Sequence, residues 1–486
     1  MYMIRILLCL FFLSFRLVSS SQVSVGSISH SLKKTAKNIQ GSFSVVNTKN
    51  NDIATFISDR KYIYGYLTDA SFKVEDTLLL KKNRRYRGIV GTMFSSKNTY
   101  TFIVANPNVT NFASIIFDFK KDTTFISKEI FNTKGLTLLQ SISKPDKVHL
   151  LFLKQNTSDL VVKTYNENGN TTSKVFRLKN EKLLINKTKE TTIAKLLFNV
   201  LYNDYTITKI ENSKDNHVSS PPLETAAEFS KLYAGENDIR IVFDKNKFYT
   251  QILTLNLNDG TYAFKKIKKP LFTISGKNKT SNSFLYDNLL FTTASSKNKL
   301  VIQVHYLKTN ELLKEFIINS GKHIPFKNHS LVIQGKKYKT KKNSTLSKSF
   351  VRKMYYGDIG ISVEKQPQGY VISIGGKKPA TLNNPMMSFK ISENTFQAIN
   401  NYRGFIDPHS QKLQSIRNKK PTYLKTTIDN DFTPSNGKFE DDVYTKINNY
   451  IEKKNPRSTS HIFQLNDTMI FSFYDKKTNT YQFVAF

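Results

Sequence analysis

The chain has 486 residues, of which 39% are hydrophobic and 12% aromatic, and its formal net charge is +36. The length and the aromatic content exclude an intrinsically disordered chain, because such a composition can bury a large core. The charge favours an anionic partner. A chain rich in Lys and Asn that lacks Trp also results from an AT-rich coding sequence, so both explanations of the charge stay open.

The N-terminus, residues 1–21, has the pattern of a secretory signal peptide. Arg5 precedes an apolar run over 6–15, and small residues over 18–21 suit a cleavage site. The run is too short to span a bilayer as a helix, which takes about 20 residues. We therefore expect a secreted, periplasmic or cell-surface protein whose mature chain has no transmembrane span. An uncleaved anchor is the alternative, and Arg16 is atypical of a signal peptide.

The single cysteine, Cys9, lies inside this leader. Cleavage would leave a mature chain without thiols, which excludes disulfides, a cysteine nucleophile and thiolate metal ligands.

Pairs of short apolar strands joined by polar turns recur along the rest of the chain. In chain order they are 53–57 with 62–66, 89–94 with 99–104, 148–153 with 160–165, 239–243 with 248–255, 288–294 with 300–306, and 468–474 with 480–486. A second turn follows some pairs, as at 166–169 and 258–260, where Gly and Asn tolerate the positive φ of a tight hairpin. The spacing predicts one further pair between 165 and 237, and two or three between 306 and 468.

Units of four short antiparallel strands at this spacing resemble the blades of a β-propeller. We therefore predict an all-β fold, a β-propeller-like ring of six to eight four-stranded antiparallel blades with seven as the central value. Residues 22–486 would form a single domain. The well-patterned strand at 480–486 is expected to close the ring, which leaves no sheet edge exposed. The resemblance is to the architecture alone, since no family repeat motif is present.

Two short helices interrupt the strand pattern. Residues 220–235 begin with Ser220 and two prolines and end at Gly235, as a capped helix does. In 439–454, Val443, Ile447 and Ile451 share one helical face. We expect insertions near 219–235 and 400–456, with 400–438 as a long loop or linker.

Signatures of catalysis are missing from the sequence. Residues 369–378 lack the spacing of a phosphate-binding loop, and 256–260 is better explained as a hairpin turn than as half of a calcium site. Only His323 and His329 lie close together, and not at a zinc spacing. We therefore predict no cofactor and no metal site, and we expect a protein that is not an enzyme. Catalytic residues that converge from distant blades stay possible.

Basic clusters with interleaved tyrosines are the candidate binding residues. They are Lys81, Lys82, Arg84, Arg85, Tyr86 and Arg87 in one cluster, and Lys336, Lys337, Tyr338 and Lys339 in another. A third basic run covers 265–269. Tyrosine beside cations suits stacking together with anion contacts. The alternative is that these runs are solvated loops, and their placement on one face of the ring would favour a site.

The sequence thus predicts a non-catalytic recognition scaffold, secreted or in the cell envelope. Its predicted partner is a protein or an anionic polysaccharide or lipopolysaccharide surface, and no dedicated nucleic-acid site is evident. The alternative is an extracellular hydrolase or lyase acting on polysaccharide at the propeller channel. The oligomeric state has no signal in the sequence.

Overall fold

The computed structural model describes most of the chain after the leader. The described residues are 23–30, 39–86, 88–95, 97–127, 129–199, 204–210, 221–329, 331–333, 336–338, 344–377, 422–435, 443–454 and 459–486. Within them, seven sheets have four or five strands and two small sheets have two. No helix in this described part is both long and apolar enough to cross a membrane.

The first three sheets follow one another directly along the chain. Sheet 1 holds β2 (Gly41–Val46), β3 (Ile53–Ser58), β4 (Tyr62–Thr68) and β5 (Val74–Lys81). Sheet 2 holds β6 (Gly88–Phe94), β7 (Thr99–Ala105), β8 (Phe112–Asp118) and β9 (Thr123–Ile126). Sheet 3 holds β10 (Leu136–Ser143), β11 (Lys147–Lys154), β12 (Leu160–Asn166) and β13 (Thr171–Phe176).

An inserted segment separates sheet 3 from sheet 4. It contains β14 (Leu183–Leu184), β15 (Glu190–Thr191), α2 (Ile193–Leu197), β16 (Phe198–Asn199) and β17 (Asp204–Tyr205). Sheet 4 then holds β18 (Thr208–Ile210), β19 (Ser230–Ala234), β20 (Asp238–Phe243), β21 (Tyr249–Asn256) and β22 (Tyr262–Lys268), with α3 (Leu223–Ala226) between β18 and β19. The strands β18 and β19 pair in parallel, and the other pairs of this sheet are antiparallel.

The remaining sheets complete the set. Sheet 5 holds β23 (Thr280–Tyr286), β24 (Leu289–Ser295), β25 (Lys299–Tyr306) and β26 (Glu311–Asn319), after the short 3-10 helix η1 (Gly276–Asn278). Sheet 6 holds β29 (Asp358–Gln366), β30 (Gly369–Lys377), β31 (Thr422–Asp429), β27 (Leu331–Ile333) and β28 (Lys336–Tyr338), with α4 (Ser344–Tyr356) before β29. Sheet 7 holds β32 (Ser460–Leu465), β33 (Thr468–Asp475), β34 (Thr480–Ala485) and β1 (Val23–Ser29), and α6 (Val443–Lys454) precedes it.

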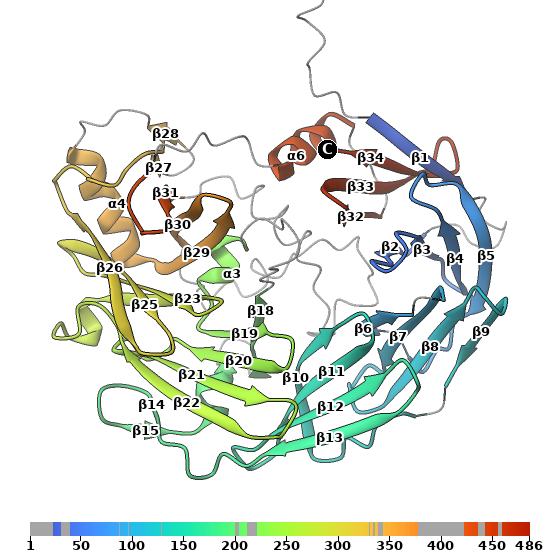
Figure 1. The fold of residues 1–486 in the computed structure, drawn as a ribbon, viewed down its shortest axis with the longest axis horizontal. Coiled ribbons are helices and arrows are strands. Elements are labelled where there is room, and N and C mark those ends of the chain that lie inside the picture. Colours follow the sequence, from blue (N-terminus) through green and yellow to red (C-terminus); the bar gives the residue numbers. More distant parts are fainter. Residues whose placement is uncertain are drawn as a thin grey trace, which may run out of the picture.

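The sheets stand around a ring as blades (Figure 1), with β5, β9, β13, β22 and β26 at the periphery. Neighbouring blades touch through their innermost strands, for example β2 with β32 and β23 with β29. The fold is therefore a β-propeller of seven blades, which confirms the predicted fold class. All six strand-turn-strand pairs read from the sequence are strand pairs of these blades.

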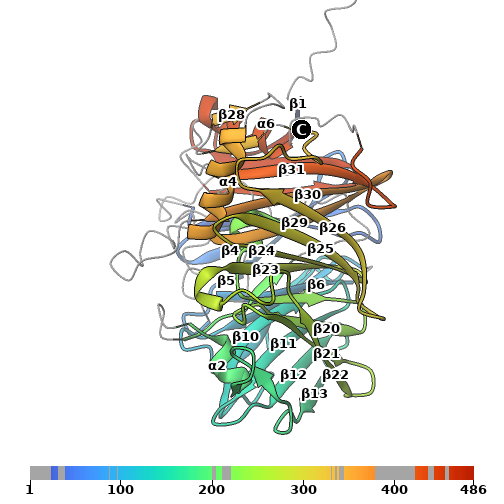
Figure 2. The same ribbon diagram turned by 90° about the vertical axis from the view of Figure 1, so that its left-hand side faces the viewer.

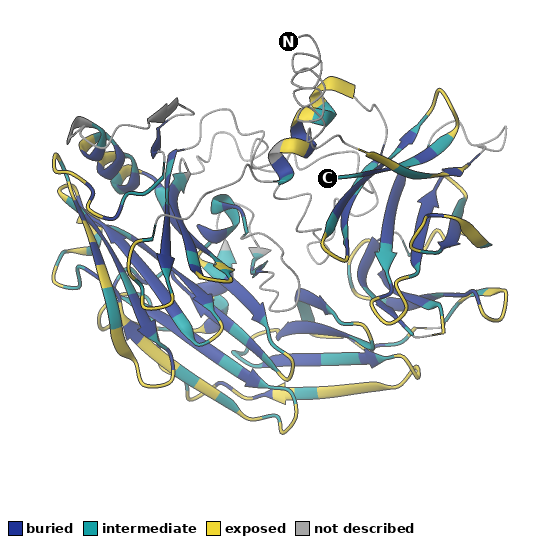
Figure 3. Cartoon of the chain, turned by 45° about the horizontal axis from the view of Figure 1, so that its top comes forward, coloured by how far each residue is buried: buried dark blue, intermediate teal, exposed yellow. Residues whose placement is uncertain are grey.

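Hydrophobic clusters join consecutive blades. One cluster spans blades 1 and 2, and there the ring of Phe56 lies 4.6 Å from that of Phe102 and 5.0 Å from that of Phe117. Other clusters span blades 7 and 1, blades 2 and 3, blades 3 and 4, and blades 4 to 6. Within the described residues, blades 6 and 7 share no such cluster. Figure 3 shows the exposed residues mainly on the outer strands and the turns.

The ring closes by pairing its two ends in sequence. The strand β1 pairs antiparallel with β34 and forms the outermost strand of blade 7. Across this joint, Tyr474 Oη donates to the His30 carbonyl at 3.1 Å, and Tyr481 Oη donates to Ser42 Oγ of blade 1 at 3.0 Å. The predicted closing role of the last strand pair is thus confirmed, and the N-terminal strand supplies its partner.

The tight turns confirm the roles expected of Gly and Asn. Gly169 and Gly260, at the predicted second turns, have φ of 79° and 78°, and Asn156 and Asn479 also adopt positive φ. Gly375 serves a different purpose in β30, since a Cβ there would lie 2.5 Å from Leu223 Cδ1 of α3. The absence of a side chain at Gly375 permits α3 to pack on the sheet, and the residue belongs to the strand β30 and not to a phosphate-binding loop.

One predicted helix is largely wrong. The helix expected over 220–235 is only α3, and 230–234 is the strand β19, which pairs on both sides within blade 4. Tertiary pairing overrides the helical pattern there. The second predicted helix is confirmed as α6, whose Ile447 packs with Tyr444 against blade 7.

The long loop expected over 400–438 is wrong where the structure describes it. The strand β31 lies inside that range and forms part of sheet 6, while 400–421 and 436–438 lie outside the described residues. The helix α4 was not predicted. The described residues between 306 and 468 hold two of the expected strand pairs, β27 with β28 and β29 with β30, and both belong to the single blade of sheet 6.

Candidate anion-binding face

Counted outward from the innermost strand, and leaving out β18, which pairs in parallel with β19, the strands of each blade alternate in direction, which gives the ring two distinct faces. Turns between the first and second strands, and between the third and fourth, lie on one face, which we call the opposite face. Turns between the second and third strands, and the links from one blade to the next, lie on the other, which we call the basic face. Figure 2 shows the link helices α2 and α4 together on one side of the ring.

The turns of the opposite face carry slightly more acidic than basic residues. Its turns carry the acids Asp52, Asp69, Asp122, Asp146, Glu167, Glu236, Asp259, Asp287, Asp431 and Asp467, and the bases Lys49, Lys73, Lys97, Lys120, Lys121, Lys144 and Lys308. On the basic face, lysines and arginines outnumber acids several times over, and two of its acids, Asp59 and Asp244, are buried. The positive charge of the turns is therefore concentrated on one side of the ring.

The first predicted cluster lies on the basic face, in the link from β5 to β6. Lys81, Arg84 and Arg85 are exposed there. Lys82 is half-buried, and its Nζ donates to the Asp59 carbonyl at 2.6 Å. Burial lowers the pKa of Lys82 to about 8, against the opposing effect of Asp59. Lys82 therefore helps to hold the link in place.

Arg85 in the same link has two neighbours of its own. Its guanidinium lies 5.6 Å from the centre of the Tyr86 ring, and Nη2 lies 3.9 Å from Glu129 Oε2. Arg87 lies outside the described residues. The cation and aromatic pairing expected from the sequence is thus present at Arg85 and Tyr86.

The second predicted cluster is also on a link, between blades 5 and 6. Lys336, Lys337 and Tyr338 form β28, and Lys339 lies outside the described residues. In Figure 1, β28 lies at the upper left and β5 at the right of the ring. The fold places the two clusters on the same face but on different blades far around the ring, so they do not form one patch.

A third cluster, which we call the Lys/Phe cluster, unites the run at 265–269 with distant residues. It consists of Lys187, Lys247, Lys268, Lys279, Phe248 and Phe272. The rings of Phe248 and Phe272 meet edge to face at 5.8 Å. Lys187 Nζ lies 4.9 Å from the centre of each ring. Cations over aromatic faces are attracted by the ring quadrupole.

The other lysines approach the same two rings. Lys268 Nζ lies 5.4 Å from the centre of the Phe272 ring, and Lys279 Nζ lies 4.4 Å from that of Phe248. Lys279 is 1% exposed and its Nζ donates to the Leu271 carbonyl at 2.8 Å. Burial, and then Lys269, Lys187 and Lys247, lower the pKa of Lys279 to about 8. Several positive charges therefore act on one another here.

The sequence alone could not reveal the Lys/Phe cluster. Lys187 comes from the hairpin of β14 and β15, which Asn246 fixes by donating from Nδ2 to the carbonyls of Leu184 at 3.0 Å and Asn186 at 2.7 Å. The only sequence signal is the basic run at 265–269 just before Phe272.

The nearest buried acid, Asp244, is already paired. Its carboxylate accepts from Lys231 Nζ and lies opposite Lys269 Nζ, each at 2.7 Å, and all three side chains are fully buried. It also accepts from Thr250 Oγ1 and Ser283 Oγ. Burial would raise its pKa, but the two ammonium groups outweigh burial and hold that pKa well below the usual range. This network locks blade 4 to blade 5.

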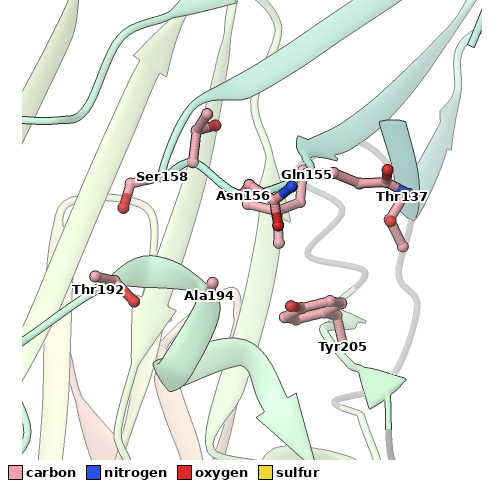
Figure 4. Close-up of a pocket in the computed structure, with 9 residues that line it drawn as sticks. Thr137, Gln155, Asn156, Ser158, Thr192, Ala194 and Tyr205 are labelled. Atoms are coloured by element: carbon pink, nitrogen blue, oxygen red, sulfur yellow. The ribbon is translucent and has the colours of Figure 1, made fainter. Parts of the chain in front are cut away.

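A pocket of about 470 Å³ opens beside the inserted segment (Figure 4). It lies between the turn at 155–158 of blade 3 and the residues Thr192, Ala194 and Tyr205 of the insertion, with Thr137 at its wall. Its lining mixes hydroxyl and amide groups with the apolar side chains of Leu153 and Ala194, and it carries no Lys, Arg, Asp, Glu or His. Hydroxyl and amide groups of this kind both donate and accept hydrogen bonds.

The described residues hold no group of three or more His, Cys, Asp or Glu side chains that could bind a metal ion. The histidines that the structure describes in strands are structural in their surroundings. His149, for example, is buried in β11 with its Nδ1 2.7 Å from Thr164 Oγ1.

Comparison with known proteins gives no family. No family model matches the chain, and no curated protein matches it. Among solved structures, it is similar to the WD40 domain of SCAP from fission yeast at 7% identity and a TM-score of 0.33, over 96% of this chain and 97% of that one. It is also similar to the β-propeller domain of Nup133 from Vanderwaltozyma polyspora, at 9% identity and a TM-score of 0.33, over 97% and 99%.

A third structure of this kind is the Dos1 propeller, at 8% identity and a TM-score of 0.30, over 94% of this chain and 82% of that one. Likenesses of this size establish neither a common function nor a common partner. The fold assignment above stands on the sheet topology of the chain itself.

Proposed function

We propose that this protein is a binding scaffold that holds an anionic surface polymer against its basic face. The observation that carries the proposal is the difference between the two faces, because the opposite face has more acids than bases in its turns. A basic composition alone would charge both faces alike. Concentrated positive charge attracts polyanions and speeds their association.

The leader pattern at 1–21 supports a location outside the cytoplasm, where acidic surface polymers are found. In this proposal the first and second basic clusters extend the contact around the ring, with Arg84, Arg85 and Tyr86 on one link and β28 on another. A long polymer can reach several links at once, and its affinity then grows by multivalency.

Retention on an acidic-polysaccharide column across a salt gradient tests this function. The protein should elute later than an unrelated globular protein of the same net charge, because its charge is gathered on one face. Elution no later than that reference protein would overturn the proposal. Binding to polyanions should weaken steeply with salt, as counterion release requires.

A further inference from the structure

The inserted segment between blades 3 and 4 lies between two unlike surfaces. On one side the pocket is lined by Thr192 and Ala194 of this segment, and on the other Lys187 reaches the Lys/Phe cluster. Lys187 and Thr192 are only five positions apart in sequence. Extended chain spans at most about 3.6 Å per residue, so the Cα atoms of these two residues are within about 18 Å of each other.

We propose that the pocket and the Lys/Phe cluster together form the main binding site for an acidic polysaccharide. The inference rests on the proposed function and names its ligand class and its place. The pocket takes a neutral part of a sugar unit, and the lysines take the acidic group of a neighbouring unit.

The chemistry of the two surfaces distinguishes a polysaccharide from other polyanions. Sugar hydroxyls donate and accept hydrogen bonds, which the hydroxyl and amide groups of Thr137, Gln155 and Ser158 can match. A polyphosphate offers acceptors only, so it could pair with the donors of this pocket but would leave its acceptors without a partner. The combination of an uncharged pocket that carries hydroxyl and amide groups with a lysine cluster therefore fits a chain that carries both hydroxyl and acidic groups.

The Lys/Phe cluster is able to receive an anion because its charges are poorly neutralised nearby. Among the acids close to it, Asp244 is occupied by Lys231 and Lys269. Asp358 acts on Lys247. The groups that act on Lys279 are cationic, from the hairpin (Lys187), the turn after β20 (Lys247) and the link after β22 (Lys269). An anion at this place would relieve their mutual repulsion.

Binding should therefore be accompanied by proton uptake near pH 8. Lys279, with a pKa of about 8, is only partly protonated there, and a nearby anion raises that pKa. Calorimetry in buffers of different ionisation enthalpy should show uptake at pH 8 and little at pH 6.5. The variant Lys279→Arg keeps the positive charge, but its guanidinium group does not titrate near pH 8. Binding of the anion should therefore persist without proton uptake. Uptake that is unchanged in Lys279→Arg would contradict the role of this lysine.

The site is tested with the full chain by fluorescence anisotropy of two labelled probes, a polygalacturonate oligomer and a polyphosphate of similar charge. Lys187→Ser/Lys268→Ser should weaken binding of both probes about five- to tenfold, the sum of two exposed ion pairs. The matched control Lys49→Ser/Lys73→Ser removes the same charge from the opposite face and should change either affinity less than twofold. Equal losses in the two double variants would overturn the placement of the site.

The pocket is tested by Thr137→Val/Ser158→Ala, which removes hydroxyls and no charge. Binding of polygalacturonate should weaken severalfold while binding of polyphosphate stays unchanged. If both affinities change alike, or neither changes, the assignment to a polysaccharide is wrong. If the unaltered protein binds neither probe, the proposed function itself is wrong. If the unaltered protein binds strongly and none of these substitutions changes its affinity, only this inference is wrong.

Discussion

The buried network at Asp244 gives the most quantitative prediction. Asp244→Asn keeps the size of the side chain but removes the carboxylate charge that lies opposite the buried ammonium groups of Lys231 and Lys269. Removal of one member of a buried ion pair costs about 3–5 kcal/mol. With an unfolding entropy of about 2.1 cal/mol/K per residue, a ring of this length loses about 1 kcal/mol per degree, so the Tm should fall by about 3–5 °C if the ring melts as one unit.

The assay is thermal unfolding followed by far-UV circular dichroism, since the chain has no Trp to report fluorescence. Asp259→Asn is the matched control, because Asp259 lies in an exposed turn of the same blade on the opposite face. It should change stability by less than about 0.5 kcal/mol. The pKa of Asp244 lies below its unfolded value of about 3.9, so the pair contributes fully above pH 4 and is lost only as the pH falls further. Equal Tm values for the two variants would refute the reasoning.

Other predictions concern pH, packing and ring closure. Burial, together with Lys144 and Lys147, lowers the pKa of His149 to about 4, so the unfolded chain binds the extra proton between about pH 6.5 and 4. The contribution of His149 to the free energy of unfolding should fall by about 2 kcal/mol from pH 7 to pH 5. Urea titrations of His149→Leu should show a smaller loss of stability over this pH range than the unaltered protein does. An identical loss in both proteins would contradict the role of His149. Gly91→Ala should cost about 1–3 kcal/mol, because its Cβ would lie 2.5 Å from Val148 Cγ1, and Val148→Ala in the same chain should restore part of the Tm. Removal of residues 468–486 should abolish cooperative melting, since β1 and β32 would lose the strands between them; a retained sharp transition would disprove closure by this hairpin.

The sequence predicts the blades well because each strand pair carries its own signals. Apolar strands such as β24 and β25 and turns with positive φ are local features, and their repetition indicates the ring. Prediction from the sequence fails where pairing between strands that are distant in sequence decides the local structure. β19 resembles the end of a helix until β18 and β20 flank it, and β27 joins sheet 6 beside β31 although about 90 residues separate them.

Part of the candidate site can likewise be predicted from the sequence, and part cannot. The basic runs at 81–87 and 336–339 are visible in the sequence, and the placement of their described residues, Lys81 to Tyr86 and Lys336 to Tyr338, on one face follows from the strand order. The Lys/Phe cluster is not visible, because Lys187 reaches Phe248 and Phe272 only through the hairpin that Asn246 fixes. A site assembled from an insertion and two links has no sequence motif of its own.

The central claim is that an acidic polymer binds on the basic face, and lysine footprinting tests it most directly. The full chain is acetylated with and without polygalacturonate at low salt, and the modified lysines are measured by mass spectrometry. Lys187, Lys268 and Lys81 should become protected, while Lys49, Lys73 and Lys121 on the opposite face should react as before. Protection that is uniform over both faces, or confined to the opposite face, would contradict the account.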